Sequence, residues 1–166
     1  QYTGFSVNSL YRIAKGTNGN MYGGCSNIHD MYQSTRLQDA QLDAIDGNGK
    51  IVYSTNNGST WTTLHTFNHP VFWLAIDPNN PDVLYAATWQ RHRTVAGYLG
   101  GGPGSGLHKS TDGGETWKRV LFANAEAGAV DLVNDPGNPS VMYAATWKVL
   151  RTPYSLESGG EGSGIW

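Results

Sequence analysis

The chain repeats part of its own text at an interval of 58 residues, and this repeat restricts the possible folds more than any other feature. The segment AIDPNNPDVLYAATW at 75–89 returns at 133–147 as VNDPGNPSVMYAATW. The short phrase GSG followed by an aliphatic residue also recurs, at 104–107 and 162–165, with the same spacing. Self-similarity at a fixed period indicates an array of similar structural units rather than one irregular domain.

A fainter third copy opens the chain. Residues 18–24 resemble 81–87, and residues 50–54 resemble 106–110. We therefore expect one domain spanning residues 1–166 and containing nearly three units, with approximate boundaries at 1–59, 60–115 and 116–166.

Each unit reads as four short strands. An apolar run is stopped by a turn rich in Asp, Asn and Pro, a second apolar run follows, and a Gly-rich connection leads to a hairpin whose turn is Asp-Gly-Gly. In the middle unit the expected strands lie at 72–76, 83–89, 107–110 and 116–122, with the connection at 97–106. Repeated units of four antiparallel strands are typical of β-propeller blades. A β-solenoid is the alternative, but its rungs are shorter.

The hairpin phrase itself occurs twice, as STNNGSTW at 54–61 and STDGGETW at 110–117. This pattern, Ser-x-Asp-x-Gly-x-Thr-Trp, resembles the Asp-box or BNR repeat of sialidases, xyloglucan-cleaving hydrolases and sortilin-type propellers. The surrounding text is most similar to bacterial sortilin-like BNR proteins. The matching positions are Ser54, Gly58, Thr60 and Trp61, with Asn56 in the Asp position, and Ser110, Asp112, Gly114, Thr116 and Trp117.

The resemblance implies that each box lies at the blade periphery, on the hairpin between the third and fourth strands, and has a structural role. Asp112 is expected to accept hydrogen bonds from backbone N–H groups of the turn, and Asn56 to do the same without charge. We also expect the repeated tryptophans Trp61, Trp89, Trp117 and Trp147 to belong to the core.

Three units are too few to close a propeller, which usually has four to eight blades. Residues 1–5 align loosely with the strand that follows a box, and residues 162–166 with the strand that precedes one. We therefore expect either a segment of a longer propeller or a chain that completes a ring by self-association, since two copies would supply six blades.

Composition excludes several functions. The formal charge is −2 and the isoelectric point about 6.2, so no basic surface for nucleic acid is expected. No apolar run is long enough to cross a membrane, and no nucleophile or phosphate-binding motif is present. The single cysteine, Cys25, excludes an internal disulfide and a cysteine-based zinc site. We expect no cofactor and no metal.

Candidate functional residues are few. Asp131 replaces Trp73 on the expected innermost strand, where an acid could face a central cleft, and it is the weak catalytic candidate. Other acids lie in the connections, namely Asp30, Asp39, Asp43, Asp46, Glu157 and Glu161. Glycoside hydrolysis needs two carboxylates about 5–9 Å apart, and sequence alone places no such pair. For ligand binding the candidates are Tyr98, Tyr154, Arg91 and Arg93, although loop aromatics also serve to cover blade faces.

Two functions remain open. The first is a secreted or cell-surface propeller module, extracellular or periplasmic, that binds a protein or a glycan through its connecting loops. The alternative is part of a propeller glycoside hydrolase, similar to xyloglucanases, with carboxylates at the central cleft.

Overall fold

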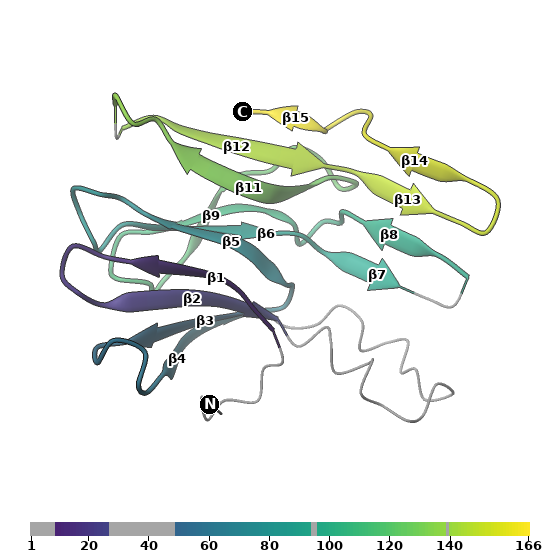
Figure 1. Cartoon of the computed structure of the whole chain (residues 1–166). Helices are drawn as coiled ribbons and strands as arrows, with labels where there is room; N and C mark the ends of the chain where they lie inside the picture. The colour runs from purple at the N-terminus through teal and green to yellow at the C-terminus, as the bar shows by residue number, and fades with distance from the viewer. Residues whose placement is uncertain (1–8, 27–48, 94–95, 139) are drawn as a thin grey trace, which may run out of the picture.

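The computed structural model of the chain describes residues 9–26, 49–93, 96–138 and 140–166. The regular secondary structure within these ranges consists of β-strands (Figure 1). The strand expected at residues 1–5 lies outside the described residues. No helix in the described part is long and apolar enough to span a membrane.

Three antiparallel sheets form the body of the molecule. The first has the order β1 (Ser9–Lys15), β2 (Met21–Ser26), β3 (Gly49–Ser54), β4 (Thr62–Phe67). The second contains β5 (Val71–Ile76), β6 (Leu84–Thr88), β9 (Gly106–Ser110) and β10 (Lys118–Leu121), paired in that sequence. The third contains β11 (Gly128–Asn134), β12 (Met142–Trp147) and β15 (Gly164–Ile165). The predicted four-strand unit is confirmed in the first two sheets.

The first strands of the three sheets lie next to one another. Both β1 and β11 contact β5, so the sheets meet along their innermost strands (Figure 1). Each innermost strand is irregular at the same place in its unit, with register shifts at Leu10/Arg12, Val71/Trp73 and Ala129/Asp131. A bulge increases the local twist of a strand. The arrangement is a β-propeller-like fold, which confirms the predicted fold class.

The core lies between the stacked sheets. Between the first and second sheets it is built from large aliphatic side chains, including Ile51, Leu74 and Leu84, each at most 1% exposed. Between the second and third sheets it is built from smaller ones, such as Ala87, Ala129 and Ala144 with Leu107 and Leu132. The second sheet is therefore buried on both faces, which explains the apolar run through β6.

The hairpin between β9 and β10 is held by its own side chains. Ser110 Oγ accepts a hydrogen bond from Gly114 N at 2.8 Å and donates one to Asp112 Oδ1 at 2.7 Å. Asp112 accepts from Thr116 N at 2.9 Å and also from the Thr116 hydroxyl. The bonds from the Thr116 side chain and backbone, together with that from Ser110, hold the pKa of Asp112 far below its ordinary value.

The hairpin between β3 and β4 repeats this structure with an amide. Gly58 N donates to Ser54 Oγ at 2.9 Å, and Thr60 N donates to Asn56 Oδ1 at 2.9 Å. The Asn56 amide N–H donates to Thr60 Oγ1 at 2.7 Å, in place of the hydroxyl–carboxylate bond of the other hairpin. Asn57 adopts φ of 54° here, where the second hairpin has a glycine. The Asn56 amide therefore closes its turn as the Asp112 carboxylate closes the other.

One expectation about the tryptophans is wrong. Trp89 is 4% exposed, but Trp147, at the same repeat position, is 36% exposed. Trp89 is covered on several sides, because Gly100, Gly128 and the ring of Trp147 all approach it closely. The Trp147 ring packs against Trp89 in a tilted arrangement, with centroids 5.2 Å apart, and leaves much of its surface outside the core.

The connection at 97–106 is not simply a loop. Together with its repeat equivalent it forms a fourth sheet, which we call the insertion sheet. Its strands pair in the order β14 (Leu156–Ser158), β13 (Val149–Arg151), β8 (Tyr98–Gly100), β7 (Arg91–Arg93). The strands project from one end of the second and third sheets (Figure 1). The insertion sheet joins two successive units by backbone pairing.

Candidate functional site

The insertion sheet is anchored by a set of side-chain hydrogen bonds that occurs in both the middle and the last unit, and we call this set the clasp. In the middle unit Thr88 Oγ1 lies 3.3 Å from the carbonyl oxygen of Gly104, and Ser105 Oγ accepts from Gln90 N at 2.8 Å. In the last unit Thr146 Oγ1 donates to the carbonyl of Gly162 at 2.6 Å, and Lys148 N donates to Ser163 Oγ at 3.0 Å. The recurring GSG phrase thus closes the base of each insertion, a role that sequence reasoning did not assign.

Glycine is required between β8 and β9 because the backbone passes close to other atoms. A Cβ on Gly101 would lie 1.7 Å from the carbonyl oxygen of Glu126, and one on Gly100 would lie 2.2 Å from the Trp89 ring. Gly101 also has φ of 121°, a conformation that L side chains rarely adopt. Arg119 of β10 fixes the same loop from outside by donating to the Pro103 carbonyl at 2.6 Å. The loop between β8 and β9 is therefore held in one position by its neighbours.

The register divides the insertion sheet into two faces. His92, Leu99, Leu150 and Glu157 lie opposite one another across the four strands. Because side chains alternate along a strand, this row occupies one face, and the rows on either side of it occupy the other. The first face borders a pocket, and the second is directed toward an aromatic cluster.

The pocket has a volume of about 220 Å³ and lies where the two units meet. Its walls are mainly aliphatic, and polar groups come from both units. The lining residues are Gln90, His92, Leu99, Gly101, Gly102, Pro103, Ala125, Glu126, Lys148 and Leu150. Such a mixture of apolar walls and a few converging polar groups is common in ligand-binding sites.

Lys148 is the basic side chain of the pocket, and Glu126 is the acidic one. The Nζ of Lys148 lies 2.6 Å from Glu126 Oε2 and 3.8 Å from Glu157 Oε2. The contact with Glu126, and more weakly the negative charge of Glu157, raises the pKa of Lys148. The lysine side chain is 20% exposed, whereas the two glutamates are about three-fifths exposed. The two carboxylates therefore share one ammonium group at the edge of the pocket.

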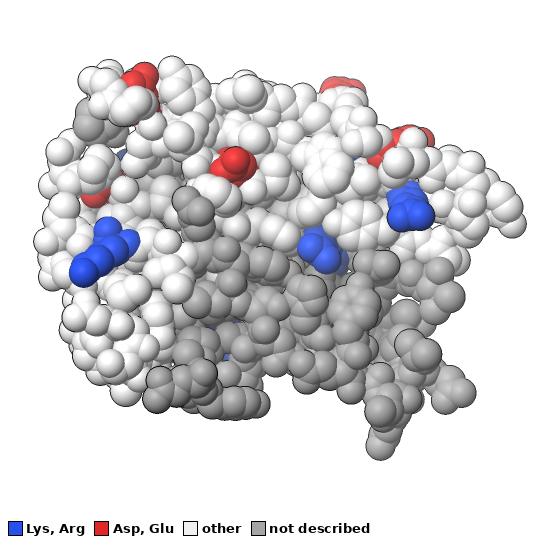
Figure 2. Space-filling model, viewed as in Figure 1, with Lys and Arg blue, Asp and Glu red and all other residues white. Residues whose placement is uncertain are grey.

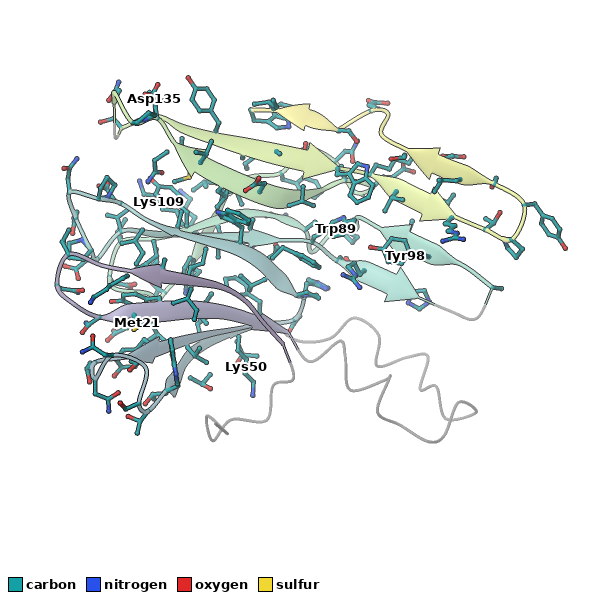
Figure 3. The ribbon with its side chains drawn as sticks, viewed as in Figure 1. Met21, Lys50, Trp89, Tyr98, Lys109 and Asp135 are labelled. Carbon is teal, nitrogen blue, oxygen red and sulfur yellow. The ribbon has the colours of Figure 1, made fainter. Side chains whose placement is uncertain are left out.

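The opposite face of the insertion sheet packs on rings. Arg91, on β7, places its guanidinium 5.2 Å from the Phe72 ring, 5.5 Å from Tyr98 and 5.8 Å from Trp89. Tyr98 and Trp89 meet edge to face with centroids 6.1 Å apart. Figure 3 shows both rings at the end of the molecule that carries the insertion sheet, far from Asp135. This cluster seats the sheet on the blades.

The ligand-binding candidates are thus separated by the structure. Arg91 and Tyr98 lie together in the aromatic cluster, with Tyr98 partly buried. Tyr154 lies at the tip of the β13–β14 hairpin and is 97% exposed. Arg93 holds the last position of β7, opposite Tyr98. Their part in ligand binding stays a prediction.

The acidic candidates are also dispersed. Asp131 is exposed on β11, and its Oδ1 accepts from the N–H of the next residue, Leu132, at 2.7 Å. Glu157 joins Lys148, and Glu161 contributes its carbonyl oxygen to Asn124 at 3.0 Å. The four aspartates of the first connection, Asp30, Asp39, Asp43 and Asp46, lie outside the described residues. Within the described part of the chain, no group of three or more His, Cys, Asp or Glu residues could hold a metal ion.

The charged residues form no large patch on the visible face. Lys and Arg appear as separate spots on the described surface in Figure 2, and so do Asp and Glu.

The sequence contained one signal for the pocket, because Gln90 and Lys148 occupy the same repeat position. The sequence did not show that the two hairpins that follow these residues pair with each other, so the pocket was not predicted.

Comparisons with known proteins agree on the fold. An ancestral GH74 enzyme is similar over 91% of this chain, with a TM-score of 0.54 and 20% identity. An α-L-arabinofuranosidase of Fusarium graminearum gives a TM-score of 0.47 with 13% identity over 97% of the chain. The chain spans 20% of the first protein and 49% of the second. No protein-family model and no curated protein matches the sequence. The similarity to the GH74 enzyme supports the β-propeller-like fold.

Proposed function

We propose that this chain is part of a propeller module that binds a protein or a glycan on the insertion sheet. The proposal rests on one contrast: the residues that anchor the two insertion hairpins are the same in both units, whereas the residues around the pocket differ. The clasp residues Thr88 and Ser105 return as Thr146 and Ser163, so the frame is kept from one unit to the next. Positions that are partly or fully exposed change at the same interval, in the pairs Gln90/Lys148, His92/Leu150, Leu99/Glu157 and Pro103/Glu161.

Such a contrast fits recognition. Identical anchoring residues position the two hairpins in the same way, while the differing residues give each junction between units its own chemistry. The pocket offers Leu99, Leu150 and Pro103 to an apolar portion of a ligand, and Lys148 with Glu126 to a polar one. Connecting loops on a rigid scaffold are where binding sites usually occur. The module is proposed to act outside the cell, at the surface or in the periplasm.

The alternative function is glycoside hydrolysis. The similar proteins of known structure include a GH74 enzyme and an arabinofuranosidase, and the first supports the fold alone. Hydrolysis needs one carboxyl group that can donate a proton and a second that acts as base or nucleophile. Lys148 pairs with Glu126 and lies 3.8 Å from Glu157, so a substrate would have to displace that ammonium group from Glu126. The pocket chemistry therefore favours binding over hydrolysis.

The test is a binding screen with a matched pair of variants. Xyloglucan, arabinan and β-glucan are presented in affinity gels, and a peptide array supplies extended polypeptide ligands. Leu99→Asp puts a charge on the pocket wall, where Leu99 is 40% exposed, and Val120→Asp does the same on β10, where Val120 is 48% exposed. We expect any ligand found to be lost with Leu99→Asp and kept with Val120→Asp.

Two results would contradict the proposal. Equal binding by both variants would place the ligand elsewhere on the molecule. Release of reducing sugar from a polysaccharide, abolished by Asp131→Asn with binding intact, would establish the hydrolase instead.

A further inference from the structure

The insertion sheet contains the same strand edge twice, once covered and once open. β14 is the repeat equivalent of β8, because the two strands are displaced by 58 residues. β8 pairs with β7 on one side and with β13 on the other, where Gly100 opposes Val149. β14 pairs with β13 on one side, and no strand in the described part of the chain pairs with its outer edge. The covered edge of β8 therefore shows what the outer edge of β14 is built to bind.

The hydrogen-bond pattern shows which backbone groups of β14 face outward. In antiparallel pairs, hydrogen-bonded and non-hydrogen-bonded positions alternate. Gly159 N donates to the Lys148 carbonyl at 2.9 Å. Two residues back along the strand, Glu157 therefore directs its backbone N–H and C=O toward β13. Leu156 and Ser158 direct theirs away from the sheet.

β8 has the same pattern, and there the outward groups are used. Gly101 N donates to the Gln90 carbonyl at 2.9 Å, so Gly100 directs its backbone groups away from β7 and toward β13. Gly100 holds the repeat position of Ser158. The outward groups of β14 are thus the equivalents of those with which β8 binds a strand.

Apolar side chains border the outer edge of β14. Trp147 Nε1 donates to Ser158 Oγ at 3.1 Å, so the Trp147 ring lies on the same face of the sheet as the Ser158 side chain. Leu156 shares this face, because it lies two residues from Ser158. Trp147 is 36% exposed and Leu156 is 67% exposed. A strand paired with β14 would therefore place alternate side chains against these two.

The equivalent ring of the middle unit shows which kind of side chain covers such a surface. A Cβ on Gly100 would lie 2.2 Å from the Trp89 ring and 2.5 Å from Val149 Cγ1. Val149, which belongs to the pairing strand, thus lies close to Trp89 and helps to bury it. Among the described residues Val149 has no counterpart beside Trp147.

We propose that β14 binds an extended segment of a ligand protein by strand addition. The segment runs antiparallel to β14, as β13 does to β8, and forms hydrogen bonds with the backbone of Leu156 and Ser158. Its residue opposite Ser158 is aliphatic and covers Trp147. Its residue opposite Glu157 lies on the face that borders the pocket, so one ligand contacts both. This inference rests on the proposed function, since it names the kind of ligand that the insertion sheet takes.

The short edge favours an extended peptide over other occupants. In strand addition, main-chain hydrogen bonds supply affinity and alternate side chains supply specificity. β14 has three residues, so its edge offers much less surface than the roughly 1,200 Å² buried between stably associated folded proteins. A glycan has no alternating N–H and C=O groups at the spacing of a strand. An extended segment needs only this edge and the ring beside it.

A peptide with the sequence KVLRT, that of residues 148–152, probes the edge because these residues include the strand that covers β8. It is capped at both ends and titrated into the isotope-labelled chain, which is followed by NMR. We expect the backbone amide signals of Leu156 and Ser158 and the indole signal of Trp147 to shift, while the signals of β10 stay unchanged.

Two N-methylated forms of this peptide are the matched pair. With the peptide valine opposite Ser158, the valine N–H faces β14 and the leucine N–H faces away from it. N-methylation of the valine should weaken binding about tenfold, because it removes one hydrogen bond and leaves a backbone acceptor unpaired. N-methylation of the leucine should leave the affinity unchanged.

Ser158→Pro extends the test to any ligand found in the binding screen. Proline removes one outward N–H from β14. We expect the ligand to be lost with Ser158→Pro, as with Leu99→Asp, and to be kept with Val120→Asp.

The outcomes separate this inference from the proposed function. A ligand that requires Leu99 but still binds the Ser158→Pro chain would overturn strand addition and leave the pocket standing. Equal binding of the two methylated peptides, or no shift on β14, would also overturn it. A mass above 18.0 kDa for the chain alone, with the β14 signals shifting on dilution, would assign the edge to a second copy instead. Peptide binding at β14 together with a ligand that ignores Leu99→Asp would refute the pocket and support strand addition.

Discussion

His108 should make the junction between the first two sheets sensitive to acid. It lies on β9, and its ring centroid is 4.9 Å from that of Phe67. Nε2 of His108 is buried and has no hydrogen-bond partner among the described residues. Burial first, and then the positive charges of Arg119, His65 and His69, lower the pKa of His108 from 6.5 to about 4.

The size of the effect follows from the shift. The unfolded chain binds a proton at His108 near pH 6.5, whereas the folded chain does so only near pH 4. Stability is therefore intact above pH 6.5, falls as the pH drops through this interval, and levels off below it. One pKa unit corresponds to about 1.4 kcal/mol, so the full loss approaches roughly 3 kcal/mol. The pKa of His65 is also lowered by burial, which adds a loss of the same sign.

Urea denaturation at pH 7, 6, 5 and 4 measures this loss. We expect His108→Gln to flatten the pH dependence between pH 4 and 6.5, because the residue no longer titrates. His92→Gln replaces an exposed histidine on β7 and serves as the matched control, with an unchanged slope. The reasoning would be refuted if His108→Gln and the unmodified chain lost stability equally over this interval.

Three further predictions concern the turns and clasps. Gly101→Ala should lower the free energy of unfolding, measured in urea, by roughly 2–5 kcal/mol, because Gly101 has a positive φ and an added Cβ would lie 1.7 Å from the Glu126 carbonyl oxygen. Gly159→Ala, at the equivalent repeat position with φ of 93° and nothing within 4 Å, should lower it by only roughly 1–2 kcal/mol. Equal losses would contradict the steric argument. Ser105→Ala should cost about 1–3 kcal/mol by leaving Gln90 N without its acceptor, and an unchanged midpoint would show that water replaces the hydroxyl. Asp112→Asn should leave stability at pH 7 nearly unchanged, since Asn56 closes the same turn, but should remove a loss of stability below the ordinary carboxyl pKa; a large loss at pH 7 would show that the charge itself is needed.

The body of the fold could be predicted because its signals are local. The strands of the middle unit begin and end within two residues of the expected positions, and the largest difference is at β10, which starts at Lys118. Pro, Asn and Gly at the turns leave few alternatives for the chain between them. The repeat then carried the interpretation of one unit to its neighbours.

The insertion sheet could not be predicted in the same way. Its strands have three residues each, too few for alternation to be visible, and the partner of β8 is about 50 residues away in sequence. The glycines of this stretch were interpreted as part of a Gly-rich connection, whereas in the structure Gly100 and Gly101 allow close packing against Trp89 and Glu126. The alignment of QRHR at 90–93 with KVLR at 148–151 was the one available signal, since a shared register implies a shared structure.

Stability should decline from the inside of the insertion sheet to its β14 edge. Gly100 and Val149 are buried at the centre, where the aromatic cluster supports the pairing of β8 with β13. β14 has no buried residue, and among the described strands it pairs only with β13. Few buried contacts imply local opening at low free energy, so β14 should exchange its amide protons fastest. Hydrogen exchange measured residue by residue tests this expectation, and slower exchange on β14 than on β8 would contradict it.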